Sequence, residues 1–180
     1  MAGRKLTPKQ AARMLLNFEK KLDRVVIRAF NVGLRQAHKA ALKNPSMQGL
    51  GKGKNARPPN PPPGPLGIRT GRLRRAVDIN KAKKVGDKWI GGLKVDLNAA
   101  PYGAIHEFGG TTSAHVIRPV NKSILSWMGP GGVRVFARKV NHPGSRIPAR
   151  PYLGPALKRT APQIAGIIDS SIAELGREFF

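Results

Sequence analysis

The chain has 180 residues, 40% of them apolar, with 21 glycines, 16 prolines and no cysteine. This length suits one domain with a substantial core, and the lack of cysteine excludes disulfides and thiolate metal sites. No apolar run reaches the ~18–20 residues that a membrane-spanning helix needs, and no apolar segment typical of a secretory signal follows the basic N-terminus. We therefore expect one intracellular domain, residues 1–180, that has no membrane-spanning segment and, apart from its surface charge, no sign of a membrane partner.

The net charge is +24, from 33 basic and 9 acidic side chains. Solubility alone favours a charge of only ~2–8 in a small domain, so an acidic partner is expected to offset the self-repulsion. The excess is uneven, because residues 1–75 hold 18 of the basic side chains and 2 of the acidic ones. Nucleic acid, an acidic protein surface and an anionic membrane surface are all open on charge alone.

A long amphipathic helix is expected from Thr7 to about Lys43. Thr7 is a good N-cap, and Pro8 suits the first helical position because its missing N–H is not needed there. Apolar residues then recur at three- and four-residue steps, which predicts one apolar stripe formed by Leu15, Phe18, Leu22, Val25, Val26, Ala29 and Val32. The opposite face is basic, and it is either a solvated face or a contact for DNA or an acidic neighbour: Lys20, Lys21, Arg24, Arg28, Arg35 and Lys39.

Residues 44–67 are of a different kind, with the sequence GLGKGKNARPPNPPPGP at their centre. Glycine and lysine favour flexibility, and the proline run favours extended polyproline II backbone. The run resembles a ligand for an SH3-type domain, but a mobile loop or spacer is the preferred interpretation. Lys52 and Lys54 are candidate contacts for a polyanion or an acidic partner, and they do not form a phosphate-binding loop.

Short strands are expected in the middle of the chain. Thr70 is expected to cap a short helix whose basic residues are further candidate contacts for a polyanion or an acidic partner: Arg72, Arg74 and Arg75. Ala76–Lys81 and Lys88–Leu97 are then predicted strands, joined by a turn at 86–87 and with a bulge or close approach at 91–92. Further β segments are predicted at 116–120, 124–128 and 133–140, with a hairpin connection at 129–132.

The chain is predicted to close with a second amphipathic helix. Pro151 can lie near its start, and Pro162 is expected either to kink it or to restart it after Thr160. One apolar face follows at helical spacing: Ile164, Ile168, Ile172, Leu175 and Phe179. The predicted fold class is α+β, a small antiparallel sheet packed with a long N-terminal helix and a C-terminal helix, with a flexible loop at 44–67.

Catalytic and metal-binding patterns are weak. His106-Glu107 lacks a second histidine at zincin spacing, because position 110 is glycine, and His115 and His142 lie on unrelated segments. Carboxylates that could work as an acid–base pair are scarce, and Trp89 and Trp127 fit strand positions better than base-stacking platforms. We expect no catalytic residue, no metal and no cofactor; a metal-dependent hydrolase is the least favoured alternative.

Glu107 is the one acid in an aromatic- and glycine-rich segment of a very basic chain. A cationic ion-pair partner is expected, and Arg146 and Arg150 are the candidates. A bidentate arginine–carboxylate pair could join the irregular segment that contains Glu107 to the one that contains these arginines. The pair is either an internal salt bridge or, through one of its halves, a contact with a neighbouring subunit.

Three short motifs carry a family resemblance: TGRLRRAV at 70–77, YGAIHEFGG at 102–110 and IPARPYLGPAL at 147–157. VFARKV at 135–140 adds to them. In order and spacing they resemble the neck and tail-completion proteins of tailed bacteriophages, the group described as minor tail protein Z-like or phage virion morphogenesis proteins. Motif residues are then expected to determine fold and interface: Tyr102, His106, Glu107, Phe108, Gly109, Arg150, Pro151, Tyr152 and Leu153.

The resemblance implies a structural role without catalysis. The expected protein is a virion component assembled in the cytoplasm of an infected bacterium, where a closed ring, six-fold to match the tail, joins the head connector or head-closure protein to the tail terminator or tail tube protein. The high positive charge and the loop at 44–67 are not part of the motif set. The basic surface is expected to meet acidic connector or tail subunits, or packaged double-stranded DNA. A non-specific nucleic-acid-binding protein is the alternative function.

Overall fold

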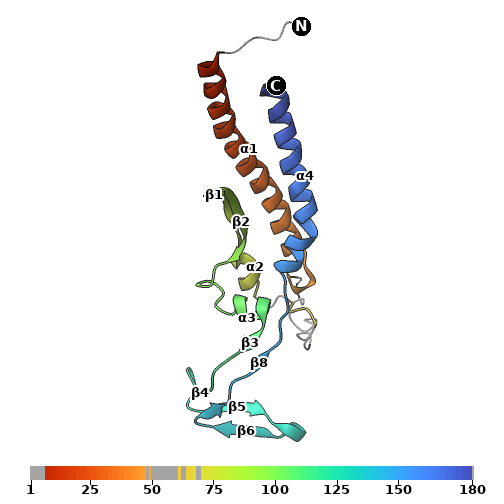
Figure 1. Ribbon diagram of the computed structural model, residues 1–180. Coiled ribbons are helices and arrows are strands. Elements are labelled where there is room, and N and C mark those ends of the chain that lie inside the picture. Colours follow the sequence, from red (N-terminus) through yellow and green to blue (C-terminus); the bar gives the residue numbers. More distant parts are fainter. Residues whose placement is uncertain (1–6, 48, 50–60, 62–63, 68–69, 180) are drawn as a thin grey trace.

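The computed structural model describes residues 7–47, 49, 61, 64–67 and 70–179 (Figure 1). Lys52 and Lys54 and most of the loop predicted at 44–67 lie outside these ranges. The elements run in the order α1 (Pro8–Leu42), η1 (Pro45–Met47), α2 (Arg72–Ala76), β1 (Val77–Val85), β2 (Lys88–Val95), α3 (Gly103–Phe108), β3 (Gly110–Thr111), β4 (His115–Ile117), β5 (Leu125–Met128), η3 (Pro130–Gly132), β6 (Arg134–Ala137), β7 (Val140–His142), β8 (Arg146–Ile147) and α4 (Gly154–Phe179).

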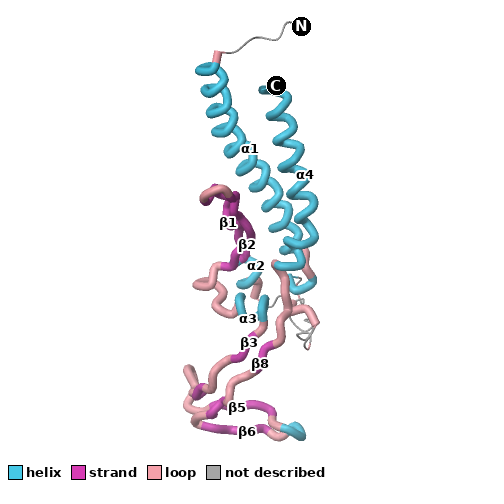
Figure 2. Tube along the Cα trace, in the orientation of Figure 1, coloured by secondary structure: helices cyan, strands magenta, loops and turns pink. Residues whose placement is uncertain are grey.

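The α+β class is confirmed, in an elongated arrangement (Figure 2). α1 and α4 lie side by side as a helical hairpin that forms one end of the molecule, and the strands β3 to β8 extend to the other end. The β1–β2 ribbon packs beside α1, and the short helices α2 and α3 lie between the two ends. The expected single sheet under two helices is instead four separate two-stranded antiparallel ladders: β1–β2, β3–β8, β4–β7 and β5–β6.

The start of α1 follows the sequence prediction. The Thr7 hydroxyl accepts a hydrogen bond from the Gln10 backbone N–H at 3.3 Å, and the Gln10 side chain in turn accepts from the Thr7 backbone N–H. This capping box satisfies two amides that the first helical turn leaves open. The buried residues of α1 all lie in its second half: Val26, Ala29, Gly33, Leu34, Ala37 and Ala41.

The apolar stripe of α1 packs against α4 and the β1–β2 ribbon, and it is exposed toward the start of the helix. Phe18 contacts the ring of Phe179, at the end of α4, with 5.2 Å between ring centroids. Leu15 lies one turn beyond that contact and is 58% exposed. Further along, a Cβ added to Gly33 would lie 2.7 Å from Ile164 of α4, so the glycine permits the close approach of the two helices.

The β1–β2 ribbon has the predicted turn at 86–87, and its irregularity lies on β1, opposite the expected bulge position. Asn80 pairs with Gly92 and Lys83 with Ile90, so two residues of β1 face Gly91 alone. The amide N–H of Ala82, displaced by this bulge, donates to Asn31 of α1 at 2.9 Å. At Gly91 a Cβ would lie 3.0 Å from the Ala82 backbone, which confirms the predicted close approach.

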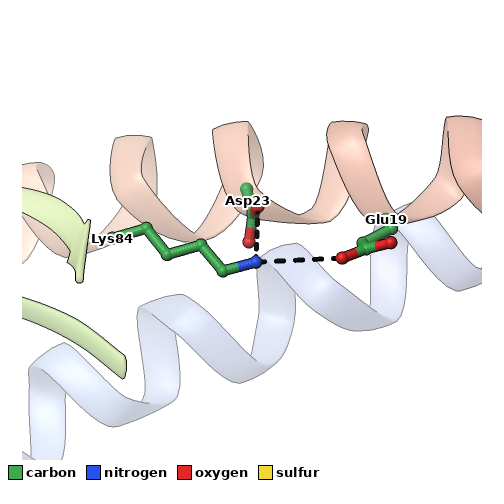
Figure 3. A network of polar contacts seen from close by, with 3 residues as sticks. All are labelled: Glu19, Asp23 and Lys84. Carbon is green, nitrogen blue, oxygen red and sulfur yellow. Dashed lines mark hydrogen bonds and ion pairs between the residues drawn. The ribbon is translucent and has the colours of Figure 1, made fainter. Parts of the chain in front are cut away.

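A polar cluster ties the end of β1 to α1. Figure 3 shows Lys84 reaching from the strand toward Asp23 and Glu19, with 2.8 Å from its Nζ to Asp23 and 4.0 Å to Glu19. The hydrogen bond to Asp23 is the main cause of a raised Lys84 pKa. Because these charged groups face water, the ion pairs contribute little to the free energy of folding, and their main effect is to orient the end of β1 relative to α1.

The remaining strands form what we call the arm, residues 110–147. Its three ladders succeed one another outward, from β3–β8 through β4–β7 to β5–β6, and the chain turns back at 129–132 as predicted. The strands are shorter than the segments predicted at 116–120 and 133–140, because each ladder is interrupted by irregular backbone. None of the arm residues, all of which the structure describes, is buried.

Three local expectations are corrected. The N-cap of α2 is Gly71, in a left-handed conformation and without a side-chain cap hydrogen bond, and not Thr70. The segment at 102–109, expected to be irregular, contains α3, a helix too short for periodicity to reveal. Of the two outcomes expected at Pro162, a restart of the helix is contradicted, because α4 runs continuously from Gly154 to Phe179 with Pro162 inside it. Packing of this helix against α1 compensates for the backbone hydrogen bond that the proline cannot make.

Candidate functional site

The two motif segments, 102–109 and 150–153, meet at a single place that we call the motif junction. The Glu107 carboxylate, 8% exposed, accepts three hydrogen bonds from consecutive backbone amides. Oε2 accepts from Tyr152 at 2.7 Å and from Leu153 at 3.0 Å, and Oε1 accepts from Gly154 at 2.8 Å. The carboxylate of α3 thus holds the first residue of α4 and the two residues before it.

This arrangement caps α4 from outside the helix. The N-terminus of an α-helix presents amides without intrahelical partners and a partial positive charge, and a buried carboxylate satisfies both. No residue at the start of α4 supplies a conventional side-chain cap, since the segment reads Tyr152-Leu153-Gly154-Pro155. A Cβ on Gly154 would lie 3.2 Å from Oε1 of Glu107, so this glycine leaves room for the carboxylate. Glu107 is therefore a fold determinant of the junction.

Tyr152 is the second anchor of the junction. Its side chain is fully buried in a cluster with Met47 and Val77, and its hydroxyl donates to the Gly103 carbonyl at 3.0 Å. Burial, with a smaller effect of the nearby Glu107 carboxylate, raises the pKa of Tyr152 to about 12. The hydroxyl therefore stays protonated and keeps its role as a donor across the neutral range.

The backbone of the two segments is also in direct contact. The Arg150 amide donates to the His106 carbonyl at 2.7 Å, at the end of α3. Gly109 follows with φ 74°, and a Cβ there would lie 2.9 Å from the Ala149 nitrogen. Only glycine suits a position that combines a left-handed backbone with so close an approach.

His106 lies next to Glu107 on α3 and lines a cavity together with Met47 and Tyr102. Burial, and then the charge of Arg150, lower its pKa. Its Nδ1 is buried and makes no hydrogen bond among the described residues, and its ring meets Tyr102 edge-on at 5.8 Å. The lowered pKa keeps His106 neutral near pH 7, as expected of a packing residue. Next to it, Phe108 is 81% exposed.

Glu107 binds backbone amides and not the arginine side chain that the sequence predicts as its partner. The carboxylate does join the two segments, but the three hydrogen-bond donors that the described residues supply to it are main-chain amides and not the side chains of Arg146 and Arg150. Arg146 lies in the arm, where its backbone pairs with Thr111 of β3 and its side chain is exposed. Arg150 is half-buried beside His106, and Pro151 is exposed.

The candidate basic contacts are spread over several surfaces. Lys20, Arg24, Arg28 and Arg35 are exposed on α1. Lys21 instead turns toward α4, where it pairs with Glu178 and lies 5.3 Å from the centre of the Phe179 ring. In α2, Arg74 donates to the Met47 carbonyl and Arg75 to the Thr70 carbonyl, both over long distances, while Arg72 is exposed.

The described residues offer little for chemistry. A cavity of about 430 Å³ beside the junction is lined mainly by Met47, Leu66, Leu73, Tyr102 and His106. Within the described ranges no three histidine, aspartate or glutamate side chains gather as a metal site would require. No described helix is long and apolar enough to cross a membrane. Comparison with models of protein families, with curated proteins and with solved structures found no match to this chain.

Sequence reasoning missed the helix-capping role of Glu107 and the arm as a structural unit. The signal for the first was the absence of a side-chain cap before α4. The signal for the second was a long gap in the acidic residues, since none occurs between Glu107 and Asp169.

Proposed function

We propose that this protein is a structural component of a tailed-phage virion, a neck or tail-completion protein that forms a closed ring at the head–tail junction. It joins the head connector or head-closure protein to the tail terminator or tail tube protein and performs no catalysis. The proposal starts from the three motifs that resemble this group of proteins.

One observation carries it: residues of the second and third motifs hold the elements of this fold together. Glu107, Gly109 and Tyr152 lie at a junction where α3, the base of the arm and the start of α4 are joined by hydrogen bonds within the chain. Residues used in this way fix the relative orientation of elements. That is what a subunit of a ring needs, because the angle between successive copies decides whether the ring closes.

The exposed surface also supports an assembly subunit. Large apolar side chains are exposed both on the helical hairpin, at Leu15 and Leu16, and throughout the arm. Exposed apolar area of this extent marks surfaces that are covered by other proteins. An elongated subunit with such surfaces at both ends suits a position between two larger assemblies.

The experiment that tests the proposal is electron microscopy of lysates from a phage with a stop codon early in this gene. The expected result is DNA-filled heads and finished tails that lie apart. A plasmid copy of the wild-type gene should restore joined particles and serves as the control. Normal infectious particles without the protein would contradict the proposal.

Non-specific binding of nucleic acid is the second candidate, and the observation that favours it is the charge of +24. It predicts tight binding to any duplex that weakens steeply as salt rises, because each neutralised phosphate releases counterions. In that case a variant that loses duplex binding should also lose function. For a neck protein the two properties should separate.

A further inference from the structure

The arm is a large unpartnered surface. Eight large apolar side chains in this segment are at least one-third exposed: Val116, Ile117, Val120, Ile124, Trp127, Met128, Val133 and Phe136. They make up half of the exposed large apolar side chains in the described part of the molecule, although the arm contains about a fifth of the sequence. An isolated two-stranded ribbon is marginally stable in water, so a partner that covers these groups would stabilise the arm.

Charge in the arm has one sign only. The segment contains no aspartate or glutamate, and all six of its basic side chains are exposed: Arg118, Lys122, Arg134, Arg138, Lys139 and Arg146. Protein interfaces are depleted in acidic residues, and the arm contains none.

The end of the arm presents these groups on one side. In the β5–β6 ladder, Ser126 pairs with Phe136 and Met128 with Arg134. Directly paired residues of an antiparallel ladder lie on the same face, and faces alternate along each strand. These four residues therefore share one face, which we call the outer face. All four are exposed, and Met128 and Phe136 are 60% and 58% exposed.

We infer that the arm is a docking element for a different protein, through a partner surface that is acidic around an apolar centre. The inference rests on the proposed function and specifies the kind of partner that the ring meets. Charge complementarity carries it: an arm with six basic side chains and no acid is attracted by an acidic surface and repelled by the equally basic arm of another copy. A phosphate backbone would match the charge but would leave valine, methionine and phenylalanine side chains in water.

The test uses full-length protein with DNA-filled heads and finished tails purified from the phage that lacks this gene. Two substitutions probe the outer face: Phe136→Ser removes the apolar centre, and Arg134→Glu reverses a charge. Val85→Ser is the matched control, because Val85 is 49% exposed on β1, outside the arm. Co-sedimentation with heads and with tails measures binding, and particle joining is counted by electron microscopy.

We expect each arm variant to bind one of the two particles about tenfold or more weakly, while the control binds like wild type. Binding should also weaken with salt for wild type and less steeply for Arg134→Glu. Circular dichroism should show unchanged helix content in all variants, since none of the substituted side chains is buried.

Three outcomes would overturn the inference. Arm variants that join heads and tails as well as wild type would show that the arm is not the docking element, with the neck function intact. Loss of rings in purified Phe136→Ser protein would identify a second copy as the occupant. Weaker binding of Arg134→Glu to a DNA duplex, with normal binding to both particles, would identify nucleic acid. A wild-type protein that joins no particles would contradict the neck function itself.

Discussion

The helical hairpin and the arm are stabilised in different ways. Along α1 and α4, small and apolar residues such as Ala37, Ala41 and Ala156 are fully buried, and Gly33 brings the helices into close contact. In the arm no residue is buried, and order comes from backbone ladders and exposed cross-strand pairs. The hairpin thus has a core within the single chain, whereas the arm has none and exposes apolar side chains that a partner could cover.

Amide hydrogen exchange tests this contrast most directly. We expect amides in β4 to β7 to exchange on the order of a thousandfold faster than those in the middle of α1, because a ladder with no buried residues opens locally without unfolding the core. The ladder β1–β2, which packs on α1, is the internal control and should be protected. Arm amides as slow as those of α1 would show that the arm is stable alone.

Glu107→Ala should have the largest effect among substitutions. It leaves a buried amide, that of Tyr152, and the part-buried amides of Leu153 and Gly154 without their acceptor, and we expect a loss of about 3 kcal/mol in the free energy of unfolding. Urea denaturation followed by circular dichroism measures it. Asp169→Ala, at an exposed position of α4, is the control and should be close to neutral. If Glu107→Ala lowers the free energy of unfolding as little as Asp169→Ala does, Glu107 does not stabilise the fold by capping α4.

Gly33→Val should loosen the helical hairpin. The added Cβ would overlap Ile164, and we expect a destabilisation of about 2 kcal/mol. Gly166→Val is the matched control, because a Cβ at this α4 position meets nothing within 4 Å. Combining Gly33→Val with Ile164→Ala should cost less than the sum of the two single changes. Strict additivity would mean that the two residues do not meet.

His106 should make a small contribution to pH dependence. Because its pKa is lowered by folding, the unfolded chain binds the proton first, so stability is present above the ordinary value near 6.5 and is lost as pH falls through the folded value. The expected loss between about pH 7 and pH 5 is the smallest of these predicted effects, since the ring is only partly buried. His106→Gln should flatten this part of the curve. Above about pH 8 the two proteins should differ by a constant offset, and an unchanged slope at low pH would exclude His106 as its source.

Regular periodicity made the fold class and the long helices predictable. Thr7 and Pro8 indicate the start of α1 through local capping chemistry, and the stripe containing Val26 and Ala29 indicates its buried face. The turn at 86–87 was equally predictable, because glycine and aspartate suit a tight hairpin connection. These features depend on residues close together in the sequence.

The junction and the arm could be predicted only in part, because they depend on long-range contacts. The motif spacing indicated that 102–109 and 147–157 belong together, but Glu107 could be matched to an arginine as readily as to three amides 45 to 47 residues away. The bulge in β1 depends on Asn31 of α1, which no strand pattern reveals. The arm strands were recognisable, whereas their lack of a core was not, since apolar alternation normally predicts burial.

The pairing of Gly110 with Ile147 has a consequence for how such a protein can change. Because the two ends of the arm are hydrogen-bonded to each other at the point where they leave the junction, the segment between them behaves as a single insertion. It can be shortened, lengthened or exchanged without altering the distance that the rest of the chain must span. A hybrid protein in which the ribbon of another protein replaces the residues between Gly110 and Ile147 should therefore keep the fold of the rest of this chain. It should acquire the binding preference of the inserted ribbon.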